Sequence, residues 1–247
     1  MTTNGERALQ RCVIRLAEAG APVPVIDVGA NVGEWSAALI RAARQAGRLP
    51  DIRLHAFEPS SYTYRRMSET LDGCGVAMFQ AGLSDRVGHA TLHVAAPGAG
   101  INSLHRPDGV AGIGTEQVAV TTLDEHAREN SLDSVALVKI DTEGHDLAVL
   151  RGARELLARQ RIAVVQFEYN HRWIYGRSFL RDAFELLEPH GYRIGKLTPR
   201  GVEFYPSWDP DLETFVEGNY IACTPRMAAR LPAVSWWKAS GPASSHS

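Results

Sequence analysis

The sequence contains few cysteines, no long apolar run and no surplus of positive charge. Its three cysteines, Cys12, Cys74 and Cys223, lie far apart and form no CxxC pair, which argues against a disulfide framework and a zinc site. No apolar run reaches the roughly 18 residues needed to cross a bilayer. The segment from Met1 to Ala19 has an amphipathic helical pattern rather than that of a signal peptide. These features predict a reduced, cytoplasmic protein without a membrane partner.

Positive charge is too scarce for a nucleic-acid partner to be expected. The 247 residues include 26 Lys and Arg against 28 Asp and Glu, which gives a formal net charge of −2. There is therefore no basic excess to neutralise phosphates. The length fits one α/β domain with an insertion.

Strand and helix patterns alternate along most of the chain, with strands marked by short apolar runs and helices by amphipathic segments. Strands are expected at 23–28, 52–57, 76–81, 135–140 and 162–167, and helices at 35–46, 62–71, 123–130, 147–160 and 179–190. Two further pairs of segments are expected to pair in antiparallel fashion, 88–95 with 116–121 as a β-hairpin and 192–196 with 219–223 at a sheet edge. Repeated strand–helix units of this size predict a doubly wound, mostly parallel α/β sheet.

The domain organisation follows from these elements. We expect an N-terminal helix in 1–22, one α/β domain in 23–225 with the hairpin and its loop inserted at about 88–121, and a partly disordered tail in 226–247. The loop at 96–115 is long for a compact domain, as functional loops often are. The N-terminal helix and the pair Trp236–Trp237 are candidate contacts of a homodimer.

The strongest local signal is the run DVGANVG at 27–33, directly after the first expected strand. The chain lacks both the GxGxxG spacing of a dinucleotide site and the GxxxxGK[ST] run of a P-loop. Ligands of open α/β sheets bind beyond the carboxyl ends of the strands, where glycine lets them approach the backbone. Asp27 would repel a pyrophosphate but attract the cationic amino group and sulfonium of S-adenosylmethionine. The alternative is a structural turn with a capping aspartate.

A second acid supports an adenosyl cofactor. Glu58 closes the second expected strand, where a carboxylate can accept hydrogen bonds from both ribose hydroxyls, and Pro59 shapes the turn that follows. Ser84 and Asp85 come after the third strand and would lie beside the adenine. A solvated Glu58 and a turn capped by Ser84 and Asp85 are the alternative interpretations.

Six short segments together carry a family resemblance. They are VIDVGANVG at 25–33, FEPS at 57–60, AGLSD at 81–85, INSL at 101–104, VKIDTEGHDLAVLRGA at 138–153 and FEYN at 167–170. In these segments the chain resembles the FkbM family of S-adenosylmethionine-dependent methyltransferases. The resemblance implies a Rossmann-like class I methyltransferase fold and O-methylation of a hydroxyl on a small molecule such as a sugar, a polyketide or another secondary metabolite. It also implies cofactor binding by Asp27, Gly29, Asn31, Gly33, Glu58, Ser84 and Asp85, to which position adds Pro59 and Asp141.

The candidate catalytic residues follow the fourth and fifth expected strands. Asp141 and His145 come after the fourth, and Glu168, Asn170 and His171 end or follow the fifth. In one interpretation His145 or His171 is the general base and Asp141 orients substrate or cofactor. In the other, Asp141, Glu168 and Asn170 bind Mg²⁺, which acidifies the acceptor hydroxyl. That metal set is similar to the one in catechol O-methyltransferases.

Tyr169 separates Glu168 from Asn170, which departs from that metal-binding pattern, so we favour a metal-free base. Lys139 lies within an apolar strand, where its charge is expected to snorkel or to pair with an acid. The acceptor side is expected to come from the 96–115 loop and from the segments 169–175 and 208–217.

Other functions remain as alternatives at this stage. An NAD-dependent oxidoreductase or another sugar-modifying enzyme would need the missing glycine spacing. A non-catalytic S-adenosylmethionine-binding protein would not need the acids and histidines at the strand ends. A nucleic-acid methyltransferase acting on amines would show an (N/D)PP(Y/F) motif where this chain has Asp141-Thr142-Glu143-Gly144.

Overall fold

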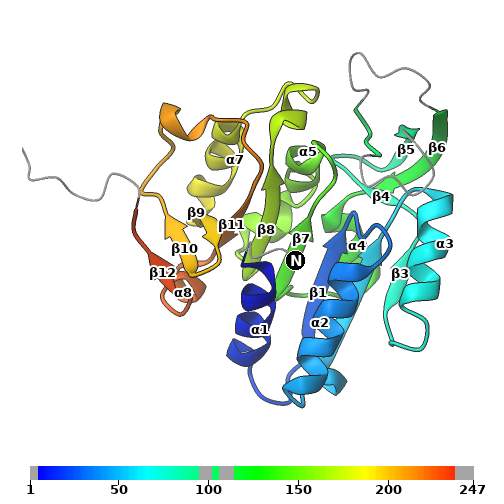
Figure 1. The fold of residues 1–247 in the computed structure, drawn as a ribbon, viewed down its shortest axis with the longest axis horizontal. Helices are drawn as coiled ribbons and strands as arrows, with labels where there is room; N and C mark the ends of the chain where they lie inside the picture. Colours follow the sequence, from blue (N-terminus) through cyan, green and yellow to red (C-terminus); the bar gives the residue numbers. More distant parts are fainter. Residues whose placement is uncertain (1–4, 95–101, 106–113, 237–247) are drawn as a thin grey trace, which may run out of the picture.

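A central sheet of nine strands organises the molecule (Figure 1). The computed structural model describes residues 5–94, 102–105 and 114–236. Within these residues the strand order is β12-β10-β9-β11-β8-β7-β1-β2-β3. The strands are β1 (Val23–Val28), β2 (Ile52–Phe57), β3 (Ala77–Phe79), β7 (Leu137–Ile140), β8 (Val164–Tyr169), β9 (Arg193–Thr198), β10 (Gly201–Phe204), β11 (Gly218–Cys223) and β12 (Ala233–Val234).

Five of these strands form the parallel part of the sheet. β3, β2, β1, β7 and β8 pair in parallel, and Asp27 of β1 stands beside Lys139 of β7, which in turn stands beside Gln166 of β8. Continuous apolar runs form these strands because helices cover both faces of the sheet, so residues pointing either way are buried. This register places three polar side chains in one row on a single face.

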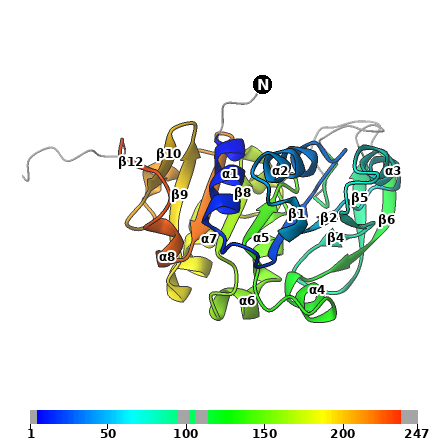
Figure 2. The same cartoon turned by 90° about the horizontal axis from the view of Figure 1, so that it is seen from below.

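Helices occupy both faces, as a doubly wound sheet requires (Figure 2). Helices α1 and α2 lie on one side of the sheet, and α4, α6 and α7 lie on the other. The helices are α1 (Glu6–Leu16), α2 (Glu34–Gln45), α3 (Ser61–Thr70), α4 (Leu123–Glu129), α5 (Asp146–Arg151), α6 (Arg154–Ala158), α7 (Leu180–Leu187) and α8 (Pro225–Ala228). The expected α/β class and the mostly parallel sheet are confirmed, and no helix of the described residues is long and apolar enough to cross a membrane.

The expected hairpin insertion is also confirmed. β5 (Gly88–Val94) and β6 (Gly114–Thr121) pair in antiparallel fashion, and β4 (Gly82–Leu83), which the sequence did not reveal, pairs in parallel with β6. Leu92, Val118 and Val120 form a small apolar core of their own under this second sheet. The loop expected at 96–115 lies largely outside the described residues, of which only 102–105 and 114–115 fall within it.

Two helical segments differ from expectation. The helix expected at 147–160 is two helices, α5 and α6, separated at Gly152. A Cβ on Gly152 would come within 2.0 Å of the carbonyl oxygen of Ser84, so the backbones touch at this point and only glycine fits. The helix expected at 179–190 ends at Leu187 and continues as one 3₁₀ turn with Pro189 near its start. The proline lacks the N–H that an α-helix would use.

The antiparallel part of the sheet is larger than expected. β9 and β11 pair as predicted, but β11 lies between β9 and β8, and the sheet continues through β10 and β12. β12 pairs in parallel with β10 at Val202 and Ala233, so part of the segment expected to be a partly disordered tail belongs to the sheet. The backbone N–H of Trp236 donates to Glu203, and Trp237 lies outside the described residues.

Candidate active site

A cavity of about 290 Å³ opens beyond the carboxyl ends of β1, β2 and β7. Its floor is formed by the turn that follows β1 and by residues at the end of β7, and α1, α2 and the small sheet contribute its walls. This is the place where open α/β sheets bind ligands. Among the residues predicted for the site, Gly29, Asn31, Glu58, Pro59, Asp141 and His145 line the cavity.

The turn after β1 brings two strands into contact. Gly29 has φ of +74°, and a Cβ there would come within 2.0 Å of the carbonyl oxygen of Asp141. Gly33 has φ of +84° and precedes the first residue of α2. The positive φ by itself favours glycine at both positions, because glycine adopts these angles with the least strain. Asn31 between them also has a positive φ, of 50°.

Glu58 closes this turn from the neighbouring strand. Its two carboxylate oxygens accept hydrogen bonds from the backbone N–H of Asn31 at 3.0 Å and of Ser60 at 2.9 Å. Glu58 is buried, and burial raises its pKa to about 7 although these two N–H donors act in the opposite direction. The carboxyl group is thus fixed at the cavity wall, as expected for a group that receives hydrogen bonds from a ligand.

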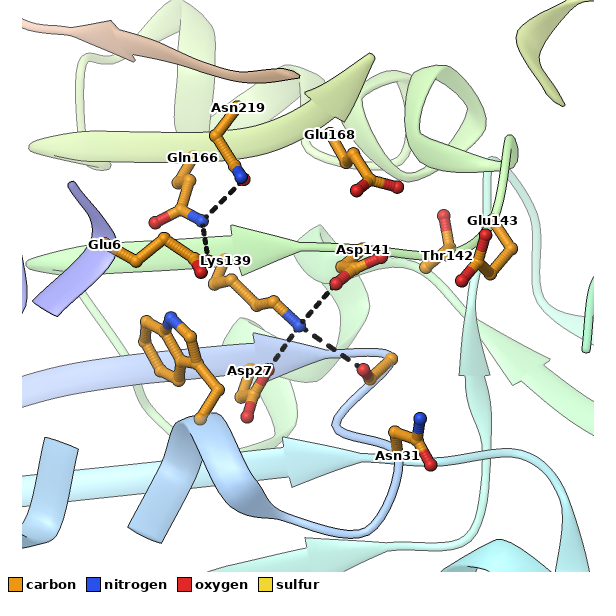
Figure 3. A network of polar contacts seen from close by, with 12 residues as sticks. Glu6, Asp27, Asn31, Lys139, Asp141, Thr142, Glu143, Gln166, Glu168 and Asn219 are labelled. Carbon is orange, nitrogen blue, oxygen red and sulfur yellow. Dashed lines mark hydrogen bonds and ion pairs between the residues drawn. The ribbon is translucent and has the colours of Figure 1, made fainter. Parts of the chain in front are cut away.

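Three groups converge on the buried ammonium of Lys139 (Figure 3). Its Nζ lies 3.4 Å from an oxygen of Asp27, 3.2 Å from an oxygen of Asp141 and 3.4 Å from the carbonyl oxygen of Gly29. Burial alone would lower the pKa of Lys139, but the charges of Asp141 and Asp27 outweigh it and raise that pKa above its usual value. The lysine therefore keeps its charge and joins the first turn to the end of β7.

Asp27 occupies a different place from the one expected. It is fully buried and is not among the described residues that line the cavity. Besides Lys139 it contacts Ser36 of α2, whose hydroxyl donates to it at 2.6 Å. Its negative charge is already balanced inside the protein. Asp27 can therefore act on a ligand only indirectly, through Lys139, which does line the cavity.

The turn after β7 carries two charged groups held in defined places. Asp146 is fully buried and accepts hydrogen bonds from Thr142 and from the backbone N–H of Glu168, which fixes the turn against β8. Glu143 lines the cavity, has φ of 55° and pairs with Arg172 at 2.6 Å. Burial, followed by the charge of Asp141, raises the pKa of Glu143 to about 7. A non-glycine residue held at positive φ is a feature often found at functional sites.

His145 lines the cavity, but both of its ring nitrogens already have partners. Nε2 lies 2.9 Å from the hydroxyl oxygen of Ser84, and Nδ1 lies 3.1 Å from Nε2 of His105. Burial lowers the pKa of His145 to about 4. Ser84 is buried and Asp85 is exposed, and neither is among the described residues that line the cavity.

The residues after β8 do not form a metal site in the described structure. The side chain of Asn170 donates to Glu168 at 2.7 Å and accepts from the backbone N–H of Arg172, so both ends of its amide are engaged. Burial and then the charge of Asp141 raise the pKa of Glu168 to about 9. His171 is exposed. No cluster of three or more His, Cys, Asp or Glu side chains among the described residues is arranged to hold a metal ion, so the alternative interpretation with Mg²⁺ is not supported.

Helix α1 contributes cavity residues that the sequence analysis did not assign. Glu6, Arg7 and Gln10 line the cavity, and Glu6 accepts a hydrogen bond of 2.5 Å from the buried side chain of Gln166, which also donates to Asn219 (Figure 3). A sequence signal existed in Gln10, a polar residue on the apolar face of the helix with Leu9, Val13 and Ile14. The position of Gln10 could not be interpreted from the sequence, because the sequence does not reveal which face of the helix packs against the sheet.

Unsatisfied polar atoms and negative charge gather in this cavity. Asn31 Oδ1, Trp35 Nε1 and Thr63 Oγ1 are buried without a hydrogen-bond partner in the described part of the chain, and all three residues line the cavity. Such atoms in a native protein call for an explanation, and a bound ligand is one. Five carboxyl residues but only two cationic ones line the cavity, namely Glu6, Glu34, Glu58, Asp141 and Glu143 against Arg7 and Lys139.

Comparison with known proteins gives consistent matches. A family model described as the methyltransferase FkbM domain matches residues 27–194. The chain is 27% identical over 213 residues to 2-O-methyltransferase NoeI of Sinorhizobium fredii, covering 79% of this chain and 82% of that protein. It is 28% identical over 142 residues to hexuronic acid methyltransferase AglP of Haloferax volcanii, covering 57% and 54% respectively. A solved S-adenosylmethionine-dependent methyltransferase from Agrobacterium tumefaciens aligns with a TM-score of 0.47 and 9% identity, covering 89% of this chain and 61% of that one.

Proposed function

The chain belongs to the FkbM family of methyltransferases, and from that premise we propose that it methylates a hydroxyl group of a sugar or a sugar-containing small molecule. It is an S-adenosylmethionine-dependent enzyme, and S-adenosylmethionine supplies the methyl group when bound. The observation that carries the proposal is the acidic cavity beyond the carboxyl ends of β1, β2 and β7, which contains unsatisfied buried polar atoms.

The residues present fit a cationic adenosyl cofactor. Its sulfonium and ammonium groups suit a cavity in which carboxyl groups outnumber cations. Glu58 is the acceptor for ribose hydroxyls, because both of its oxygens are fixed at the wall by backbone N–H groups. Asn31 Oδ1 and Thr63 Oγ1 offer acceptors, and Trp35 Nε1 offers a donor, that have no partner in the described protein.

Asp27, Ser84 and Asp85 are assigned supporting roles. Asp27 balances the charge of Lys139 and so keeps Asp141 and Gly29 in place at the cavity floor. Ser84 fixes the ring of His145, and its hydroxyl also donates to Asp85 at 3.2 Å. In this proposal the three residues hold neighbouring groups of the cavity in place and do not contact the cofactor themselves.

We assign proton removal from the acceptor hydroxyl to Glu143. A general base is most effective when its pKa lies near the working pH, and burial brings the pKa of Glu143 to about 7. Glu143 is among the residues that line the cavity, and its carboxyl group is held by Arg172 at 2.6 Å. His145 would first have to break one of its two ring hydrogen bonds, and His171 is exposed outside the described lining.

The class of acceptor is inferred from the relatives. One is called a 2-O-methyltransferase and the other a hexuronic acid methyltransferase. A sugar offers several hydroxyl groups and a polar ring, which the carboxyl groups of the cavity can bind by hydrogen bonds. The family membership removes support for the oxidoreductase alternative.

The test is calorimetry of the purified protein with S-adenosylhomocysteine, with NAD as the control, in EDTA and again in Mg²⁺. We expect micromolar binding of S-adenosylhomocysteine in EDTA, no binding of NAD and no tightening by Mg²⁺. A transfer assay with radiolabelled S-adenosylmethionine against a panel of glycans then identifies the acceptor. Absence of S-adenosylhomocysteine binding under every condition would overturn the cofactor site, whereas binding without transfer to any sugar would overturn the acceptor class alone.

A further inference from the structure

A second cavity, of about 120 Å³, lies on the other side of α1 from the acidic one. It is lined by α1, by the turn between β9 and β10, and by Leu231 and Pro232. In both views α1 stands between α2 and the β9–β10 hairpin, so its two flanks face the two cavities (Figures 1 and 2).

The charges of this second cavity are of one sign. Arg11, Arg15 and Arg200 are exposed side chains that line it, and no acidic residue is among its described lining. No ion pair joins any of the three guanidinium groups to a carboxylate within the described residues; the one bond that Arg15 donates goes to the carbonyl oxygen of Arg11 at 3.3 Å. The three groups therefore have donors available for an anion.

The walls around these arginines are formed by close backbone contacts. A Cβ on Gly5 would come within 2.3 Å of the carbonyl oxygen of Thr198, and a Cβ on Gly201 would come within 2.5 Å of the carbonyl oxygen of Pro232. The hydroxyl of Thr198 also donates to the carbonyl oxygen of Gly201 at 2.7 Å and so closes the turn that carries Arg200. Helix and turn are thus held at a fixed separation.

A row of arginines connects this cavity to the acidic one. Arg7, Arg11 and Arg15 are exposed and four residues apart along α1, so they form one row on the outward side of the helix, between the two flanks that face the cavities. Arg7 lines the acidic cavity, while Arg11 and Arg15 line the basic one. A ligand whose anionic end contacted the arginines could therefore extend along this face to the site of methyl transfer.

We propose that this cavity is an anion subsite that binds a phosphate or diphosphate group of the methyl acceptor. The inference rests on the proposed function, because it describes the same acceptor. Arginine binds phosphate and carboxylate oxygens in bidentate fashion. A carboxylate offers only two oxygens to three guanidinium groups, whereas a diphosphate offers enough oxygens and charge for all three. The acceptor is accordingly an elongated sugar phosphate ester, with its sugar toward the acidic cavity.

The test uses inorganic pyrophosphate as the probe and calorimetry at constant ionic strength, because salt screens exposed charges. The variant is Arg11→Gln/Arg15→Gln/Arg200→Gln. The control is Arg65→Gln/Arg151→Gln/Arg154→Gln, three exposed arginines on other helices that lie outside both described linings. We expect saturable binding to the wild type, a loss of affinity of about tenfold or more in the first variant and no change in the control.

Three readouts separate the possible failures. S-adenosylhomocysteine should bind all three proteins equally, which shows that they are folded and that the acidic cavity is intact. If the wild type binds S-adenosylhomocysteine but not pyrophosphate, the anion subsite is overturned and the proposed function still stands. Equal loss of pyrophosphate affinity in both variants would show a general charge effect and would also overturn it. Binding of the wild type to phosphatidylglycerol vesicles but not to pyrophosphate would assign the arginines to a membrane surface instead.

Discussion

Lys139 joins the first turn of the sheet to the end of β7 through contacts with Asp27, Asp141 and the carbonyl oxygen of Gly29. Asp27 and Lys139 are both buried, whereas Asp141, the second carboxylate beside Lys139, is partly exposed, so it is Asp27 that depends most on the lysine for its counter-charge. Removing one partner of such a pair leaves a buried charge without compensation, which costs far more than the loss of an exposed ion pair.

Lys139→Met should therefore lower the free energy of unfolding by about 3–5 kcal/mol, measured by urea denaturation. The double variant Asp27→Asn/Lys139→Met should recover a large part of that loss, because it removes the uncompensated charge as well. Lys196→Met is the matched control, since Lys196 is half-buried and lies 6.0 Å from the ring centroid of Tyr220 rather than in an ion pair. Equal losses in Lys139→Met and Lys196→Met would contradict this account.

Glu143 provides a second test at the scale of one residue. If it accepts the proton of the acceptor, it must be ionised to act, so kcat should rise with pH up to about 7 and level off above. The groups that act on its charge are the carboxylates of Asp141, Asp146 and Glu217, which favour protonation, and Arg172, which opposes it. Glu143→Gln should lower kcat by about 10²–10⁴-fold and abolish this pH dependence.

His145→Gln is the comparison that distinguishes the two candidate bases. The pKa of His145 is lowered to about 4, so catalysis by this residue would place the rise of kcat near pH 4 rather than 7. Both variants are measured with the acceptor identified by the transfer assay. A profile that still rises near pH 7 in Glu143→Gln would exclude Glu143 as the base.

At the scale of elements, α1 has a role that its distance in sequence from the other site residues conceals. Its apolar side packs beside α2, and its Glu6 is hydrogen-bonded to Gln166 of β8, which also contacts Asn219 of β11. The helix therefore completes the wall of the acidic cavity rather than standing apart from the domain. The predicted homodimer contact through this helix stays a prediction.

Glu6→Ala should loosen α1, because it leaves the buried N–H of Gln166 without one of its acceptors. Such a loss costs about 1–3 kcal/mol, so amide hydrogen exchange in α1 should accelerate by about tenfold. Glu6→Gln keeps an oxygen acceptor and should change exchange much less. Glu18→Ala, at an exposed position after the helix, is the control. Unchanged exchange in Glu6→Ala would show that the hydrogen bond does not hold the helix.

At the scale of the whole molecule, acidic and basic side chains are concentrated in different cavities, which the small net charge does not reveal. The formal net charge is only −2, yet in the lining of one cavity carboxyl groups outnumber cations, and the charged residues that line the other are three arginines, with no acid among its described residues. The fold creates this contrast by placing α1 between α2 and the β9–β10 hairpin (Figure 2). A cationic cofactor and an anionic acceptor would each find a complementary surface on opposite sides of one helix.

The sequence by itself determined the parallel half of the fold and the position of the glycine-containing turn after β1. Apolar runs such as Val23–Val28 predict buried strands, and acids and glycines directly after them must lie at the carboxyl edge of the sheet because parallel strands end together. Gly29, Asn31 and Glu58 could be predicted to meet there for that reason. The FkbM resemblance added the methyltransferase activity, which the family match supports.

Only the tertiary structure decided which charged groups line the cavity. Asp27 is turned to Lys139, and Asn170 to Glu168 and Arg172, because a buried polar group takes whichever partner packing brings within reach. The contributions of Glu6, Arg7 and Trp35 depend on which face of α1 and α2 meets the sheet, and the strands β10 and β12 depend on pairings between distant segments. Local pattern specifies where a strand ends, but contacts between segments far apart in the chain specify what its last side chain touches.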